Sequence, residues 1–134
     1  MVASSTDKIK KIQQQYLKKD LPEFEVGDTI KMKVKVAEAD KVRLHPFEGT
    51  VIQKNKRGAH STFTVRKISF GEGVERIFPL HSPVIESLTV VSKGKVKRAK
   101  LYYLRNMVGK RTRIKKEQQS AAETTTQTAP ATTP

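Results

Sequence analysis

The side chains of this sequence that are suited to chemistry are mainly cations and tyrosines near the end of the chain. The stretch from 93 to 117 contains 11 Lys and Arg residues against the single Glu117. Arginine binds phosphate in a planar, two-point manner, and tyrosine stacks on an unpaired base. The nine candidate contacts in this stretch are Lys97, Arg98, Lys100, Tyr102, Tyr103, Arg105, Lys110, Arg111 and Arg113. The stretch therefore predicts a basic arm that binds RNA.

A disordered basic tail would have a similar composition, so the apolar residues of the arm matter. Leu101, Tyr102, Leu104 and Ile114 indicate that part of the arm packs against a folded body. Of the two tyrosines, we expect one to pack into the core and the other to remain accessible to RNA.

A second basic group lies near the middle of the chain. Lys54, Lys56 and Arg57 precede Gly58, and we expect a tight turn to project the three cations away from the sheet. A glycine among cations allows the backbone to approach a phosphate closely. His60 and Ser61 complete this candidate loop. The alternative is a solvated hairpin tip, but the high charge of the chain favours RNA binding.

Arg66 and Lys67 interrupt the apolar alternation of a predicted strand. A basic residue at such a position either forms an ion pair or contacts a ligand at the surface. The acidic partners available for an ion pair are Glu72, Glu75 and Glu86. The pattern leaves both interpretations open.

The distribution of charge supports a polyanionic partner. The net charge is +14, yet residues 23–90 hold 11 basic against 9 acidic side chains. A nearly neutral body with a cationic arm is typical of proteins that bind phosphate backbones. A membrane surface would also attract this charge, but the tyrosines among the cations favour RNA.

The inventory of reactive residues argues against an enzyme. The histidines His45, His60 and His81 lie in separate segments without the spacing of a zinc site, and there is no cysteine. No glycine-rich stretch matches a nucleotide-binding loop. We therefore expect no catalysis, no cofactor, no metal and no small-molecule substrate. No apolar run approaches the roughly 20 residues that span a bilayer, so we expect a cytoplasmic protein without a membrane partner.

The pattern of apolar residues predicts a mostly β fold that would present these side chains. Ile9, Ile12 and Tyr16 have helical spacing, which predicts a short helix over 6–19. Alternation from Ile30 to Val36 then predicts the first strand. Further strands are predicted at 42–54, 60–69, 74–80 and 84–92. Five short strands with tight turns predict a small SH3-like antiparallel barrel.

This interpretation divides the chain into four parts. An N-terminal helical segment covers 1–22, and the barrel covers 23–92. The basic arm covers 93–117, where Gly109 limits any helix to one or two turns. Residues 118–134 are polar and almost uncharged, so we expect a disordered low-complexity tail.

Several ordered motifs resemble a known family. They read FEGTVI at 47–52, RGAHSTFTVRKIS at 57–69, GEGVERIF at 71–78, HSPV at 81–84 and KRAKLYYLR at 97–105. This series resembles the bacterial large-subunit ribosomal protein family numbered nineteen, over about 20–114. The resemblance implies a structural constituent of the large ribosomal subunit, with the SH3-like fold of translation proteins.

The resemblance also implies a set of partners. These are large-subunit rRNA, small-subunit rRNA across the subunit interface, where the family supports inter-subunit bridges, and neighbouring large-subunit proteins. A competing interpretation is a non-ribosomal translation or RNA-chaperone factor with the same barrel. The ribosome that holds the protein could be bacterial or organellar.

Overall fold

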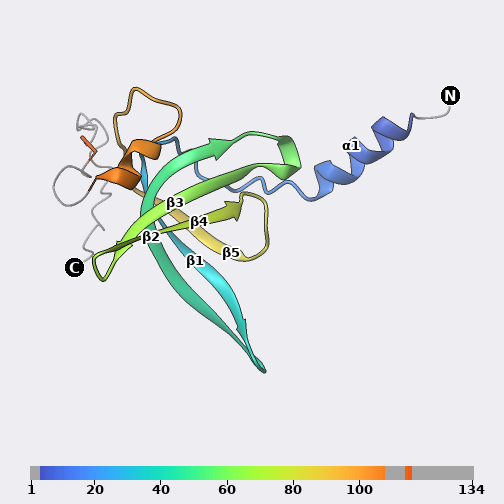
Figure 1. Ribbon diagram of the computed structural model, residues 1–134. Coiled ribbons are helices and arrows are strands. Elements are labelled where there is room, and N and C mark those ends of the chain that lie inside the picture. Colours follow the sequence, from blue (N-terminus) through green and yellow to red (C-terminus); the bar gives the residue numbers. More distant parts are fainter. Residues whose placement is uncertain (1–3, 108–113, 116–134) are drawn as a thin grey trace, which may run out of the picture.

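A computed structural model of the chain describes residues 4–107 and 114–115. One antiparallel sheet of five strands dominates it, with the strand order β4-β3-β2-β1-β5 (Figure 1). The strands are β1 (Thr29–Glu38), β2 (Lys41–Asn55), β3 (Thr62–Ser69), β4 (Glu72–Pro79) and β5 (Ile85–Ser92). The predicted mostly β class, the five antiparallel strands and the short N-terminal helix are confirmed.

The helix α1 (Ser5–Gln15) is shorter than the predicted 6–19 and extends away from the sheet (Figure 1). After Tyr16 the chain becomes irregular because contacts with the body replace helical hydrogen bonds. The backbone N–H of Lys18 donates to Nδ1 of His81 at 3.1 Å, and its Nζ donates to the Ile85 carbonyl at 2.8 Å. These two bonds attach the N-terminal segment to the start of β5.

The main core lies against one face of the curved sheet. In β1 the residues Ile30, Met32 and Val34 are buried while the lysines between them are exposed, as period-two alternation predicts. All five strands contribute to this first cluster, which consists of Phe24, Ile30, Met32, Val34, Phe47, Val51, Phe63, Val65, Phe78 and Ile85. Edge-to-face contacts between aromatic rings, such as Phe47 with Phe78 at 5.3 Å between centroids, order its centre.

The hydrogen bonding of the sheet does not close into a barrel. Strands β4 and β5 are its two edges, and the pairings run from β4 through β3, β2 and β1 to β5. Both edges nevertheless contribute to the same core, through Phe78 of β4 and Ile85 of β5. The sheet is therefore open in its pairing while its two edges bury side chains in one cluster.

A second hydrophobic cluster lies on the other side of β2. The register between β2 and β3 shifts between Val51 and Gln53, so Ile52 has no direct partner in that ladder. Val51 belongs to the first cluster, whereas Ile52 is buried with Leu101 and Leu104. The segment that follows β5 supplies this cover, including the 3₁₀ helix η2 (Tyr102–Asn106). Val51 and Ile52 are adjacent and so take opposite faces of β2, and both faces are buried at this point.

Candidate nucleic-acid interface

A groove brings together basic residues from the end of β2 and from the segment after β5. Its volume is about 400 Å³. It is lined by four basic side chains, two acidic side chains and four smaller or apolar residues: Lys54, Lys56, Lys97, Arg98, Glu23, Glu25, Phe24, Val26, Val96 and Ala99. Its walls therefore carry an excess of positive charge, although the two basic segments lie far apart in the sequence.

Lys54 is held at the wall of this groove and does not project outward. Its Nζ donates a hydrogen bond to the Phe24 carbonyl at 2.8 Å and lies 4.3 Å from the centroid of the Phe24 ring. Burial of the ammonium group, followed by repulsion from Lys56, lowers the pKa of Lys54. The prediction that a tight turn projects Lys54 away from the sheet was wrong, because the Phe24 carbonyl offers a nearby acceptor.

The connection between β2 and β3 is a short 3₁₀ helix, η1 (Gly58–His60), and not a tight hairpin turn. Gly58 has a φ of +56°, a conformation that non-glycine residues rarely adopt. The backbone N–H of Arg57 donates to Oγ of Ser61 at 3.0 Å, and that hydroxyl donates to the Gly58 carbonyl at 2.7 Å. Ser61 is buried, so its hydroxyl fixes the loop from within. Lys56, Arg57 and His60 remain exposed.

Arg66 forms the ion pair that the sequence offered as one of two interpretations. Its Nη1 lies 3.0 Å from Oε1 of Glu75, and its side chain is only 15% exposed. The guanidinium lies over Gly73, where an added Cβ would come within 2.2 Å of Nη2. Lys67 packs its Nζ at 4.5 Å from the centroid of the Phe47 ring. Both side chains therefore have partners within the fold.

Glu75 also binds the arm. It accepts hydrogen bonds from Nε and Nη2 of Arg105, both at 2.8 Å. The hydrogen bonds from Arg105 are the largest cause of the lowered pKa of Glu75, and burial partly opposes them. The same contact raises the pKa of Arg105. The sequence offered Glu75 only as one of three acidic partners for Arg66 and Lys67, so this connection to the arm was missed.

The two tyrosines of the arm have different environments, but neither is fully buried in the core. Tyr103 is half-buried and packs against the second cluster, while Tyr102 is more exposed, at 38%. The Tyr102 hydroxyl donates to Oε1 of Gln53 at 2.6 Å, which fixes the ring against β2. The guanidinium carbon of Arg105 lies 4.5 Å from the centroid of that ring. Gln53 carried no sequence pattern that would have revealed this role.

Some of the remaining cations of the arm lie within the described residues and others lie outside them. Lys97, Arg98 and Lys100 are exposed. The guanidinium carbon of Arg98 lies 5.5 Å from the centroid of the Tyr103 ring, which orients this cation beside the groove. The predicted contacts Lys110, Arg111 and Arg113, like the predicted tail at 118–134, lie outside the described residues.

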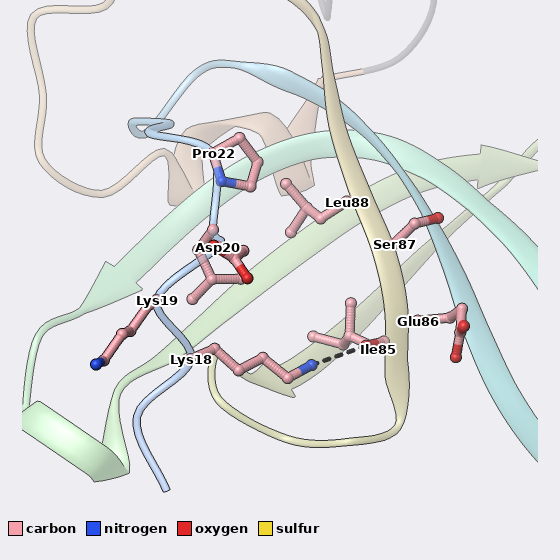
Figure 2. A pocket seen from close by; sticks show the side chains of 9 residues that line it. Lys18, Lys19, Asp20, Pro22, Ile85, Glu86, Ser87 and Leu88 are labelled. Atoms are coloured by element: carbon pink, nitrogen blue, oxygen red, sulfur yellow. Dashed lines mark hydrogen bonds between the residues drawn. The ribbon is translucent and has the colours of Figure 1, made fainter. Parts of the chain in front are cut away.

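Another hollow lies where the N-terminal segment crosses β5 (Figure 2). Figure 2 shows the side chain of Lys18 reaching to the Ile85 carbonyl across this hollow. Asp20, Pro22 and Leu88 form other parts of its lining. The hollow coincides with the attachment of the N-terminal segment, and no sequence motif predicted a ligand there.

The described residues contain neither a metal-binding cluster nor a membrane-spanning helix. Among residues 4–107 and 114–115, no group of three or more His, Asp or Glu side chains is placed to hold a metal ion. No helix in this part of the chain is long and apolar enough to cross a membrane.

Comparisons with known proteins agree with the motifs found in the sequence. The family model described as ribosomal protein L19 matches residues 7–117. The "Large ribosomal subunit protein bL19" of Clostridium novyi (strain NT) is 52% identical over 109 residues. That match covers 81% of this chain and 94% of the relative. The chain therefore belongs to the ribosomal protein L19 family, a family of structural ribosomal proteins and not of enzymes.

Proposed function

We propose that this protein binds large-subunit rRNA through the basic groove and the arm, mainly by contacts to phosphates. The observation that carries the proposal is the convergence of Lys54, Lys56, Lys97 and Arg98 on one groove. Cations placed along a concave surface follow a phosphate backbone and release its condensed counterions.

Two sets of residues make the proposed RNA contacts, and a third set supports them. The loop supplies Lys56, Arg57 and His60, and Lys54 adds a partly buried charge at the groove wall. The arm supplies Tyr102 and the exposed cations Lys97, Arg98, Lys100 and Arg105. Its sequence continues with the basic residues Lys110, Arg111 and Arg113. Ser61, Arg66, Lys67 and Tyr103 support these contacts by fixing the loop, the sheet and the arm.

Family membership extends the proposal to the place of the protein in the ribosome. We propose that it lies at the face of the large subunit that meets the small subunit, where it contacts small-subunit rRNA and supports inter-subunit bridges. Neighbouring large-subunit proteins complete its surroundings in a cytoplasmic ribosome.

We also propose that the open sheet is an SH3-like barrel in architecture, with residues 23–92 as the body and 93–117 as a basic arm. The support is that Phe78 and Ile85, on the two edge strands, share one core. A curved sheet whose edges meet around one cluster is the geometry of small partly open barrels. The arm then lies on the outside of the body through Leu101 and Leu104.

A charge-removal experiment tests the groove. The double variant Lys97→Ala with Arg98→Ala should weaken binding to protein-free large-subunit rRNA, measured by filter binding at 100 mM salt. The double variant Lys31→Ala with Lys33→Ala is the matched control, because it removes the same charge from exposed positions in β1. The groove variant should also reduce the salt slope by about 2, since each lost phosphate contact lowers it by roughly 1. Equal loss of affinity in both variants would show a nonspecific effect of net charge and would overturn the groove.

A further inference from the structure

The turn between β3 and β4 presents an aromatic ring to solvent. Phe70 is fully exposed, at 105% of its reference area, and so packs against nothing in the described part of the chain. Its φ is +51°, and the following Gly71 has a φ of +82°. Two consecutive residues of positive φ between paired Ser69 and Glu72 form a two-residue hairpin turn of the type I′ class.

This turn carries two costs that the fold of the chain does not compensate. A bulky residue at positive φ is a steric outlier, and such turns favour Asn-Gly or Asp-Gly. A fully exposed phenylalanine also leaves a large apolar area in water. A strained and exposed aromatic residue is typical of a contact site, because a partner that buries the ring offsets both costs.

The charges around the turn distinguish between an RNA and a protein partner. Glu72 is the only charged residue from 68 to 74. Behind the turn, Arg66 is paired with Glu75 and Lys67 is folded onto Phe47. A base-stacking site normally combines its aromatic residue with cations that hold the phosphates. The tip of this hairpin offers phosphates an acidic group instead.

We propose that Phe70 is an anchor that inserts into an apolar pocket, rimmed by basic residues, on a neighbouring protein of the large subunit. The exposed Ile68 precedes the turn and adds apolar area beside the anchor. Glu72 then supplies the charge complementarity to the basic rim. The inference deepens the proposed function and rests on its ribosomal placement, but it concerns a different surface from the rRNA groove.

The substitution Phe70→Asn tests both the strain of the turn and the binding role of the ring. It should stabilise the free protein and weaken its binding to the partner. Asparagine tolerates positive φ and suits this turn, so the melting temperature of the free protein should rise by about 4 °C or more. Binding to large-subunit core particles that contain their other proteins but have been washed free of this one should weaken about 30-fold, as expected for loss of an aromatic anchor. Binding to protein-free large-subunit rRNA should not change. Ile77→Thr is the matched control, because it removes another exposed apolar side chain, 69% exposed, from β4 without altering the turn.

Each alternative result contradicts a defined part of the proposal. A matching loss on protein-free rRNA would identify a nucleobase as the partner of Phe70 and overturn the protein pocket. Unchanged binding to core particles would show that the ring has no partner, and a lower melting temperature would refute the strain. A photoreactive phenylalanine analogue at position 70 should crosslink to protein in reassembled subunits, and crosslinks to RNA alone would also overturn the proposal. Failure of the wild-type protein to bind protein-free rRNA would refute the groove and not the anchor.

Discussion

Glu75 in β4 binds Arg105 in η2 through two parallel hydrogen bonds of 2.8 Å, and so fastens the arm to the sheet. The same carboxylate accepts a hydrogen bond from Arg66 at 3.0 Å. One acid therefore orients two guanidinium groups that would otherwise be free cations. In this arrangement Arg105 also lies over the ring of Tyr102, which the bond to Gln53 fixes from the other end.

This arrangement predicts a stability that depends on acidic pH. The arginines hold the pKa of Glu75 below its usual value of 4.5, so the folded state favours the carboxylate. The contribution to stability is present above the unfolded pKa and is lost as pH falls through the lower folded pKa. Glu75→Gln should therefore lower the free energy of unfolding by about 1 kcal/mol at pH 7, since the group is partly exposed. The difference from wild type should shrink below pH 4. Urea titrations at several pH values measure it, and a constant difference at all pH values would contradict the assignment.

The loop before β3 predicts a specific response to substitution of Gly58. Gly58→Val should destabilise the protein by about 1–2 kcal/mol, because a β-branched residue is strained at the positive φ observed. Nothing lies within 4 Å of the position of an added Cβ, so the cost comes from the backbone and not from a clash. Gly58→Asn is the control, since asparagine tolerates this conformation. Similar destabilisation by both variants in thermal melts would argue against the backbone explanation.

The charges of the loop predict an effect on RNA without one on folding. Lys56→Ala with Arg57→Ala should weaken rRNA binding and leave the melting temperature within about 2 °C, because both side chains are exposed. Chemical footprinting of assembled subunits should show less protection of the rRNA at the loop. Unchanged protection would mean that the arm and the remaining groove residues hold the RNA without the loop.

Phosphate contacts predict a steep response to salt. If the groove and the arm make ~6 to 10 phosphate contacts, affinity for rRNA should fall ~10³ to 10⁵-fold between 50 and 200 mM salt, by analogy with duplex DNA. Binding titrations across that range measure the slope. An affinity that hardly changes with salt would refute electrostatic binding to the phosphate backbone of the rRNA.

The burial of the arm's leucines predicts that shortening one of these side chains lowers the stability of the protein. Leu101→Ala should lower the free energy of unfolding by about 2–4 kcal/mol, since the residue is 0% exposed and covers Ile52. Val91→Ala is a control, because that side chain is 53% exposed and should cost little. A small effect of Leu101→Ala in chemical denaturation would show that the arm does not contribute to the folded body.

The sequence predicted elements whose pattern is local and missed contacts between distant segments. Ile30, Met32 and Val34 alternate with lysines, so both the strand and its buried face could be predicted. The bulge at Ile52 could not, because Val51 and Ile52 are both apolar and their pattern does not show which face each one takes. Alternation within each strand also does not show whether the two edge strands pair with each other, so it could not predict whether the sheet closes.

The candidate site was predictable as a composition and not as a geometry. Cations in the loop and the arm were identifiable from their density, but the bond from Lys54 to the Phe24 carbonyl joins residues 30 positions apart. The choice for Arg66 between an ion pair and a surface contact depended on Glu75, which faces it across the β3–β4 ladder. Such partners are set by register, which a list of residue types does not contain.

The separation of Val51 and Ile52 into two clusters orders the events of folding. Synthesis proceeds from the N-terminus, so all five strands are complete before Leu101 and Leu104 leave the ribosome that makes them. The first cluster can close while Ile52 still faces water. In the mature protein the same hierarchy means that η2 can open locally without exposing the first cluster, so its amides should exchange with solvent sooner than those of β1 and β2.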